Sequence, residues 1–135
     1  MSRRFASKLP RSAKPEPSEL QIHIALIQHL RYRARKGVVY FHAANGERRE
    51  KRDAAKLKAM GTVAGVPDLV LIKDGRTYGL ELKTSKGRVS PEQKHMLAQF
   101  EAAGAYTAVA FGLDAAIAIL TSWGILPGQP MAKAA

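Results

Sequence analysis

The sequence predicts an α/β domain with a small, mixed central β-sheet that is flanked by helices. Segments with helix signals alternate with short β-branched and aromatic segments, in the order α-β-α-β-β-α-β-α. The chain has 135 residues, 46% of them hydrophobic, which suits a single core because domains typically run to roughly 100–200 residues. It has no cysteine, which excludes disulfide scaffolds, zinc–cysteine sites and thiol nucleophiles. No apolar segment approaches the ~20 residues of a membrane span.

The first helix is expected to begin after Ser18, because Ser18 and Gln21 fit a capping box, and to end before Gly37. Its predicted buried stripe consists of Leu20, Ile24, Ile27 and Leu30/Arg31. Residues 38–42 are β-branched and aromatic, so they predict a strand, which Asn45-Gly46 ends.

A second helix, charged on most of its faces, is expected over residues 48–60. A hairpin follows over residues 68–72 and 77–84, because Asp74-Gly75 is a turn dipeptide between two apolar segments. The remaining predicted elements are a helix that Ser90 caps and Gly104 ends, a strand over Tyr106–Phe111, and a last helix from Asp114 toward Trp123.

The hairpin brings charged side chains to one face of the sheet. A turn centred on Asp74-Gly75 places Asp68 directly opposite Glu81. Lys83 lies two residues beyond Glu81 and therefore points to the same face. The opposite face collects apolar side chains for helices to cover, namely Leu69, Leu71, Tyr78, Leu80 and Leu82.

Two carboxylates that face each other on a sheet repel, so a compensating divalent cation is expected between Asp68 and Glu81. Hard oxygen ligands suit Mg²⁺ or Mn²⁺. Lys83 could then orient or deprotonate an attacking water, or neutralise the charge of a phosphodiester transition state. The alternative interpretation is that Asp68 begins a strand while Glu81 and Lys83 form a surface ion pair.

Among the four histidines, His42 is a candidate for a phosphate contact because it ends a strand just before Asn45-Gly46. His23 and His29 are six residues apart on one helix, so they project in different directions and cannot share a metal. His95 is expected to face solvent.

The net charge of +11, from 22 Lys and Arg against 11 Asp and Glu, predicts an acidic partner, most often nucleic acid. The excess is concentrated in residues 1–17, 31–36 and 45–60, whereas a merely solvated surface would mix both signs more evenly. Contacts of this kind reach the phosphate backbone and position the protein without specifying sequence. Within the last two stretches, the predicted DNA-binding residues are Arg31, Arg33, Arg35, Lys36, Arg48, Arg49, Lys51, Arg52, Lys56 and Lys58.

The hairpin residues Gly65-Val66-Pro67-Asp68 and Glu81-Leu82-Lys83 form the PD…ExK pattern of restriction-endonuclease-like nucleases. The pattern is accompanied by three further motifs, which are Ser18-Glu19-Leu20-Gln21, Asn45-Gly46 before the basic helix, and Ser90-Pro91-Glu92-Gln93. With this combination, the chain resembles the VRR-NUC nuclease family over residues 18–124.

The resemblance implies a restriction-endonuclease-like fold with a catalytic group of five residues, Glu19, Asp68, Glu81, Lys83 and Gln93. The metal ligands would be Glu19, Asp68, Glu81 and the backbone carbonyl of Leu82. Lys83 would be the catalytic lysine, and Gln93 would support the site. Each of two residues also has a simpler explanation, since Glu19 suits the helix macrodipole and Gln93 completes a capping box.

We therefore expect a Mg²⁺-dependent, structure-selective DNA endonuclease that also accepts Mn²⁺. Small stand-alone members of the family resemble phage-type Holliday-junction resolvases that work as homodimers, which implies branched DNA, a role in DNA repair and the cytoplasm of a bacterial or phage-infected cell. A membrane partner is not expected. The alternatives are a nicking or flap nuclease, an RNA nuclease, and a non-catalytic DNA-binding module. The predicted organisation is a flexible basic arm over residues 1–17, the nuclease domain over 18–126 and a disordered tail over 127–135.

Overall fold

A computed structural model describes residues 15–43 and 51–128. Within these residues the elements follow the predicted order, which confirms the α/β fold class. Their bounds are α1 Glu19–Arg33, β1 Val39–His42, α2 Lys51–Ala59, β2 Leu69–Lys73, β3 Arg76–Lys83, α3 Pro91–Ala102, β4 Tyr106–Phe111 and α4 Leu113–Ser122. The predicted arm and tail fall largely on residues 1–14 and 129–135, outside the described residues.

The four strands form one mixed sheet in the order β1-β2-β3-β4. β1, β2 and β3 are antiparallel neighbours, whereas β3 and β4 run parallel because α3 carries the chain back across the sheet. The turn between β2 and β3 places Asp74 at φ 50° and Gly75 at φ 74°, the two positive values that a two-residue type I′ hairpin requires. This turn sets the predicted register, in which Val70 pairs with Gly79.

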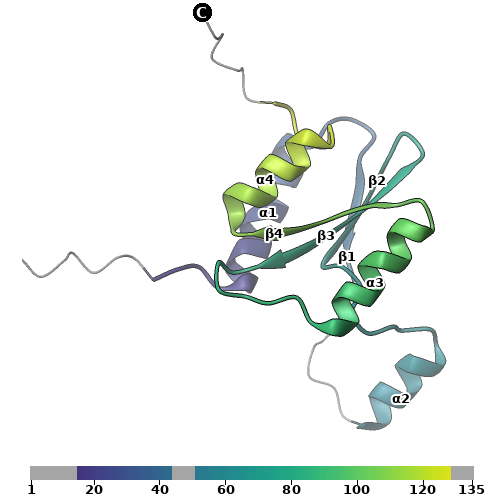
Figure 1. Ribbon diagram of the computed structural model, residues 1–135. Helices are drawn as coiled ribbons and strands as arrows, with labels where there is room; N and C mark the ends of the chain where they lie inside the picture. The colour runs from purple at the N-terminus through teal and green to yellow at the C-terminus, as the bar shows by residue number, and fades with distance from the viewer. Residues whose placement is uncertain (1–14, 44–50, 129–135) are drawn as a thin grey trace, which may run out of the picture.

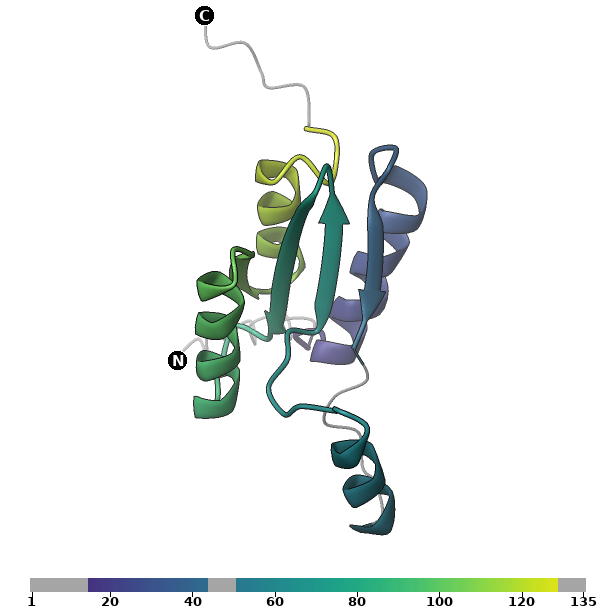
Figure 2. The same ribbon diagram turned by 90° about the vertical axis from the view of Figure 1, so that its right-hand side faces the viewer.

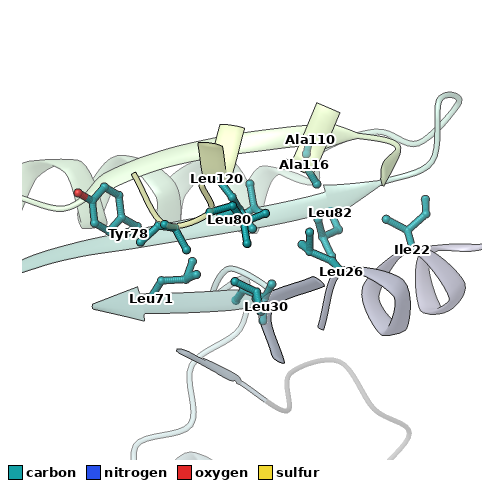
Figure 3. Packing of buried hydrophobic residues seen from close by; sticks show 13 residues of the cluster. Ile22, Leu26, Leu30, Leu71, Tyr78, Leu80, Leu82, Ala110, Ala116 and Leu120 are labelled. Carbon is teal, nitrogen blue, oxygen red and sulfur yellow. The ribbon is translucent and has the colours of Figure 1, made fainter. Parts of the chain in front are cut away.

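Helices cover both faces of the sheet (Figure 1, Figure 2). The helices α1 and α4 lie together on one face, and α3 lies on the other. Figure 3 shows how Leu26 and Leu30 of α1 point toward the leucines of β2 and β3. The buried cluster contains the predicted apolar face of the hairpin, Leu69, Leu71, Tyr78, Leu80 and Leu82, all at most 5% exposed.

The predicted buried stripe of α1 is wrong at its first two positions. Leu20 and Ile24 are 68% and 51% exposed, while the helix buries Ile22, Leu26 and Leu30. The helix carries isoleucine and leucine on two opposite faces, so periodicity alone could not choose between them. Contact with the sheet buries the face that carries Ile22, Leu26 and Leu30.

Among the described helices, none combines the length and the apolar character that crossing a membrane would need.

Candidate active site

Asp68 lies immediately before β2, where the β2–β3 ladder has already ended. The last ladder pair is Leu69 with Leu80, and Asp68 contacts β3 through its side chain, because its Oδ2 accepts a hydrogen bond of 2.8 Å from the backbone N–H of Leu82. Position 67, opposite Leu82, is a buried proline, which has no N–H to donate. Leu82 therefore has no backbone partner on β2, although it pairs with Ala110 of β4.

Three carboxylates converge at this point. Glu81 and Lys83 lie on one face of β3 and are only 2% and 8% exposed. Glu19 reaches the same place from the first turn of α1, after a capping box between Ser18 and Gln21 has fixed where the helix begins. One oxygen each of Glu19, Asp68 and Glu81 lies within 4.8 Å of the others.

A single ammonium group accompanies these carboxylates among the described residues. The Nζ of Lys83 lies 3.9 Å from Glu19 Oε1 and 3.9 Å from Glu81 Oε1. The loop that follows β3 confines the lysine stem, because a Cβ at Gly87 would come within 3.1 Å of Lys83 Cβ. Lys83 is therefore held between two acids that α1 and β3 supply.

Gln93 completes the capping box of α3 and also contacts Glu81. Its Oε1 accepts from the Ser90 backbone N–H at 2.9 Å, and the Ser90 hydroxyl accepts from the Gln93 N–H at 3.1 Å. The cap thereby fixes the orientation of the amide, and its Nε2 donates to Glu81 Oε1 at 2.8 Å. The capping box of α3 thus positions the side chain that holds the most buried carboxylate.

A glycine joins the Asp68 segment to the start of α3. Gly65 has φ +84°, and a Cβ there would lie 2.5 Å from the backbone oxygen of Glu92. The close packing forms one wall of a cleft of about 440 Å³, which Asp68, Glu81 and Gln93 also line.

The electrostatics of the site disfavour three ionised carboxylates. Burial raises the pKa of the Glu81 carboxyl to about 8, the charge of Asp68 and a hydrogen bond with it add to the rise, and Lys83 opposes it. One ammonium cannot balance three carboxylates. The donor set consists of carboxylate oxygens, which fit a hard divalent cation such as Mg²⁺.

Two histidines adjoin Asp68 on the side of β1. The rings of His23 and His42 are in edge-to-face contact, with centroids 4.5 Å apart. His42 Nδ1 lies 2.7 Å from the backbone oxygen of Asp68. Burial lowers the pKa of His23, and His42 adds to the effect. His29, by contrast, lies 2.9 Å from Arg33.

The sequence does not predict the contact between His23 and His42, because the two residues belong to different elements. The available signal is the Glu19-x-x-x-His23 spacing, which places an acid and an imidazole on one face of α1.

Those of the predicted DNA-binding residues that the structure describes lie in two separate places. Arg31 and Arg33 are in the last turn of α1, about 20 Å from Glu19 at 1.5 Å per helical residue, and Arg35 and Lys36 follow that helix. The helix α2 projects beyond the opposite end of the sheet, where β1 ends and β2 begins (Figure 2). Its Lys56 and Lys58 are exposed, while Arg48, Arg49 and the side chains of Lys51 and Arg52 lie outside what the structure describes.

Two further cations near the site lie in the loop between β3 and α3. Lys86 and Arg88 are exposed in this loop, only a few residues after Lys83. Glu16 joins the same loop, because its Oε1 accepts from the Ser85 N–H at 2.8 Å. Lys86 and Arg88 lie outside the three stretches in which the net charge is concentrated, so the charge pattern of the sequence does not indicate them.

Comparison with known proteins gives one family and one fold. Residues 9–113 match the model of the VRR-NUC domain family. A solved structure named "VRR_NUC domain protein" superposes with a TM-score of 0.66 at 22% identity, covering 82% of this chain and 97% of that one. A second, named "VRR_NUC domain", gives a TM-score of 0.52 at 17% identity, with 77% and 94% covered. No curated protein matches.

Proposed function

The chain belongs to the VRR-NUC family of nuclease domains, and from that premise we propose that it is a Mg²⁺-dependent DNA endonuclease that hydrolyses phosphodiester bonds. The observation that carries the proposal is the convergence of Glu19, Asp68 and Glu81 within 4.8 Å of one another, with Lys83 beside them. A structural ion pair needs one acid for one base, and this cluster has three acids for one.

The residues that would hold the ion are Glu19, Asp68, Glu81 and the backbone carbonyl of Leu82. All four supply oxygen, which Mg²⁺ prefers and Mn²⁺ also accepts. When bound, such an ion polarises the scissile phosphate and lowers the pKa of an attacking water. Gln93 keeps Glu81 in place, because its amide is fixed at one end by the α3 cap and donates at the other.

Lys83 acts on the reacting groups. Its ammonium is buried and lies equally far from Glu19 and Glu81, so a phosphate or water that reaches these carboxylates has a positive charge beside it. In that position, Lys83 orients the attacking water and offsets the negative charge that develops on the phosphate.

The substrate proposed for this cleft is DNA. A net charge of +11 attracts a polyanion, and exposed lysines of α2 together with Lys86 and Arg88 lie at the end of the sheet that carries the acids. These contacts reach phosphates, so binding is expected to weaken steeply with salt. The protein would then select its substrate by the shape of the DNA and not by its base sequence. The proposed substrate is branched DNA such as a Holliday junction.

The proposed active form is a homodimer. One acidic cluster of this type cuts one strand, and two symmetrical cuts at a junction need two clusters, which a two-fold axis supplies. Each protomer of such a dimer would contribute its own three carboxylates and Lys83.

Cleavage of supercoiled plasmid and of a four-way junction tests the proposal, with Mg²⁺, Mn²⁺ or EDTA present. Wild type is expected to cut with either metal and to be inactive in EDTA, while Asp68→Ala is inactive throughout. Asp74→Asn is the matched control, because Asp74 lies in the exposed turn at the far end of the same hairpin, pairs with Lys73 there, and asparagine accepts the positive φ of this turn.

Equal behaviour of wild type and Asp68→Ala would refute the nuclease proposal and favour a DNA-binding module. Flap, nicked, linear duplex and RNA versions of the same sequence separate the alternatives within the nuclease class. Preferred cutting of a flap over the four-way junction would overturn the Holliday-junction assignment.

A further inference from the structure

The two histidines next to the acidic cluster have no role in the proposed hydrolysis. His23 comes from α1, His42 is the last residue of β1, and Asp68 precedes β2. One ligand atom from each of the three lies within 4.8 Å of the other two. Three chain segments that are far apart in sequence thus bring two imidazoles and a carboxylate to one place.

The hydrogen bond of His42 fixes its tautomer. Its Nδ1 lies 2.7 Å from the backbone oxygen of Asp68, and a carbonyl oxygen can only accept, so Nδ1 carries the proton. The neutral ring then has its free lone pair on Nε2. Metal-binding histidines are oriented in this way, with the second ring nitrogen donating to a backbone carbonyl or a carboxylate.

The helix α1 connects this group to the acidic cluster. Glu19 and His23 are four residues apart and lie on the same face of the helix. Glu19 belongs to the group of three carboxylates and His23 to the histidine group, and Asp68 is a member of both.

We propose that His23, His42 and Asp68 form a second metal site, which takes a divalent transition-metal ion such as Zn²⁺ in preference to Mg²⁺. Imidazole nitrogens suit zinc and its neighbours in the first transition row, whereas Mg²⁺ favours oxygen ligands. Two histidines and one carboxylate are also a ligand set that leaves a position for water or substrate. Through the shared Asp68, occupancy of one site affects the affinity of the other.

Zn²⁺ binding to the full-length chain without a histidine tag tests this site. Calorimetric titration with Zn²⁺ is carried out in excess Mg²⁺, so that the carboxylate cluster is already supplied with its own ion. Wild type is expected to bind one Zn²⁺ per chain that Mg²⁺ does not displace. His23→Ala and His42→Ala are expected to weaken binding by at least about tenfold, because loss of a group that only hydrogen-bonds to a metal ligand already costs about 10–100-fold.

His95→Ala is the matched control, because His95 is exposed on α3 and outside the group. It is expected to bind Zn²⁺ as wild type does. X-ray absorption at the zinc edge gives a reading that needs no variant: scattering from two imidazoles is expected in the loaded wild type. Unchanged affinity in the two histidine variants, or a zinc ion with oxygen ligands alone, would overturn the assignment.

The second site and the proposed nuclease can fail separately. Glu81→Gln is expected to lose Mg²⁺-supported cleavage and to retain the tight Zn²⁺ site. Cleavage without tight Zn²⁺ binding in wild type would remove the histidine site and leave the nuclease. Tight Zn²⁺ binding without any cleavage would remove the nuclease proposal and leave the histidine site.

Discussion

Replacing Glu81 by glutamine measures the charge imbalance of the site in metal-free protein. Burial and Asp68 raise the pKa of Glu81 from its ordinary 4.5 to about 8. The folded protein therefore keeps a proton that the unfolded chain releases as the pH rises above 4.5. The contribution of Glu81 to stability is fully present below that pH and is lost progressively until pH 8.

The size of this loss follows from the shift. One pKa unit corresponds to about 1.4 kcal/mol. Because Glu81 ionises in the unfolded chain but stays protonated in the folded protein, it lowers the free energy of unfolding by about 1 kcal/mol at pH 5 and about 3 kcal/mol at pH 7. Glutamine has nearly the same shape and no charge, and its carbonyl oxygen can still accept from Gln93 Nε2. In EDTA, the stability advantage of Glu81→Gln over wild type is expected to grow by about 2 kcal/mol between pH 5 and pH 7.

Urea unfolding in EDTA at both pH values measures this difference. The single tryptophan, Trp123, is a suitable probe because it packs against Tyr78 of the core with ring centroids 4.9 Å apart. Glu92→Gln is the control, since Glu92 is exposed on α3. Mg²⁺ is expected to raise the melting temperature of wild type and to have little effect on Glu81→Gln. A difference in stability that does not change with pH, or a variant that is less stable at pH 7, would refute the reasoning.

Three further substitutions test other parts of the site. Lys83→Ala is expected to lower the cleavage rate by about 100-fold or more and to leave DNA affinity nearly unchanged; parallel loss of binding in a gel-shift assay would indicate a structural role instead. Gln93→Ala removes the donor to Glu81, and a drop of about 10–100-fold in Mg²⁺-supported activity is expected, which calorimetry with Mg²⁺ should match; rates equal to wild type would contradict it. Gly65→Ala meets both a positive φ and the Glu92 backbone, so it should lower the free energy of unfolding by about 2 kcal/mol or more. Gly61→Ala, also at positive φ but with nothing within 4 Å, should lose only about 1 kcal/mol, and equal losses in urea unfolding would contradict the packing argument.

The hairpin was predictable because its turn determines how β2 and β3 pair. Asp74-Gly75 favours one turn type, the turn fixes the register, and the register decides which side of β3 carries Glu81. The capping boxes that begin α1 and α3 were equally local signals. The order of elements followed from these short-range patterns.

What the sequence could not provide depends on contacts between distant segments. The buried face of α1 was misassigned because both faces are apolar and only the sheet distinguishes them. The contact between His23 and His42 needs α1 and the end of β1 side by side, which no local pattern indicates. Local patterns likewise do not indicate that the end of α1 at Arg31 lies far from the carboxylates of the site.

Pro67 affects the position at which β2 and β3 separate. Any other residue at position 67 could donate its backbone N–H to the carbonyl oxygen of Leu82 and lengthen the β2–β3 ladder. Asp68 would then lie within the paired part of the hairpin. Proline cannot make this bond and the Leu82 N–H donates to the Asp68 side chain, so the pairing ends at Leu69 and Leu80, two residues short of position 67, and the Asp68 carboxylate lies where the strands separate. The side chain that faces the cleft is thus placed by a backbone position that cannot donate a hydrogen bond.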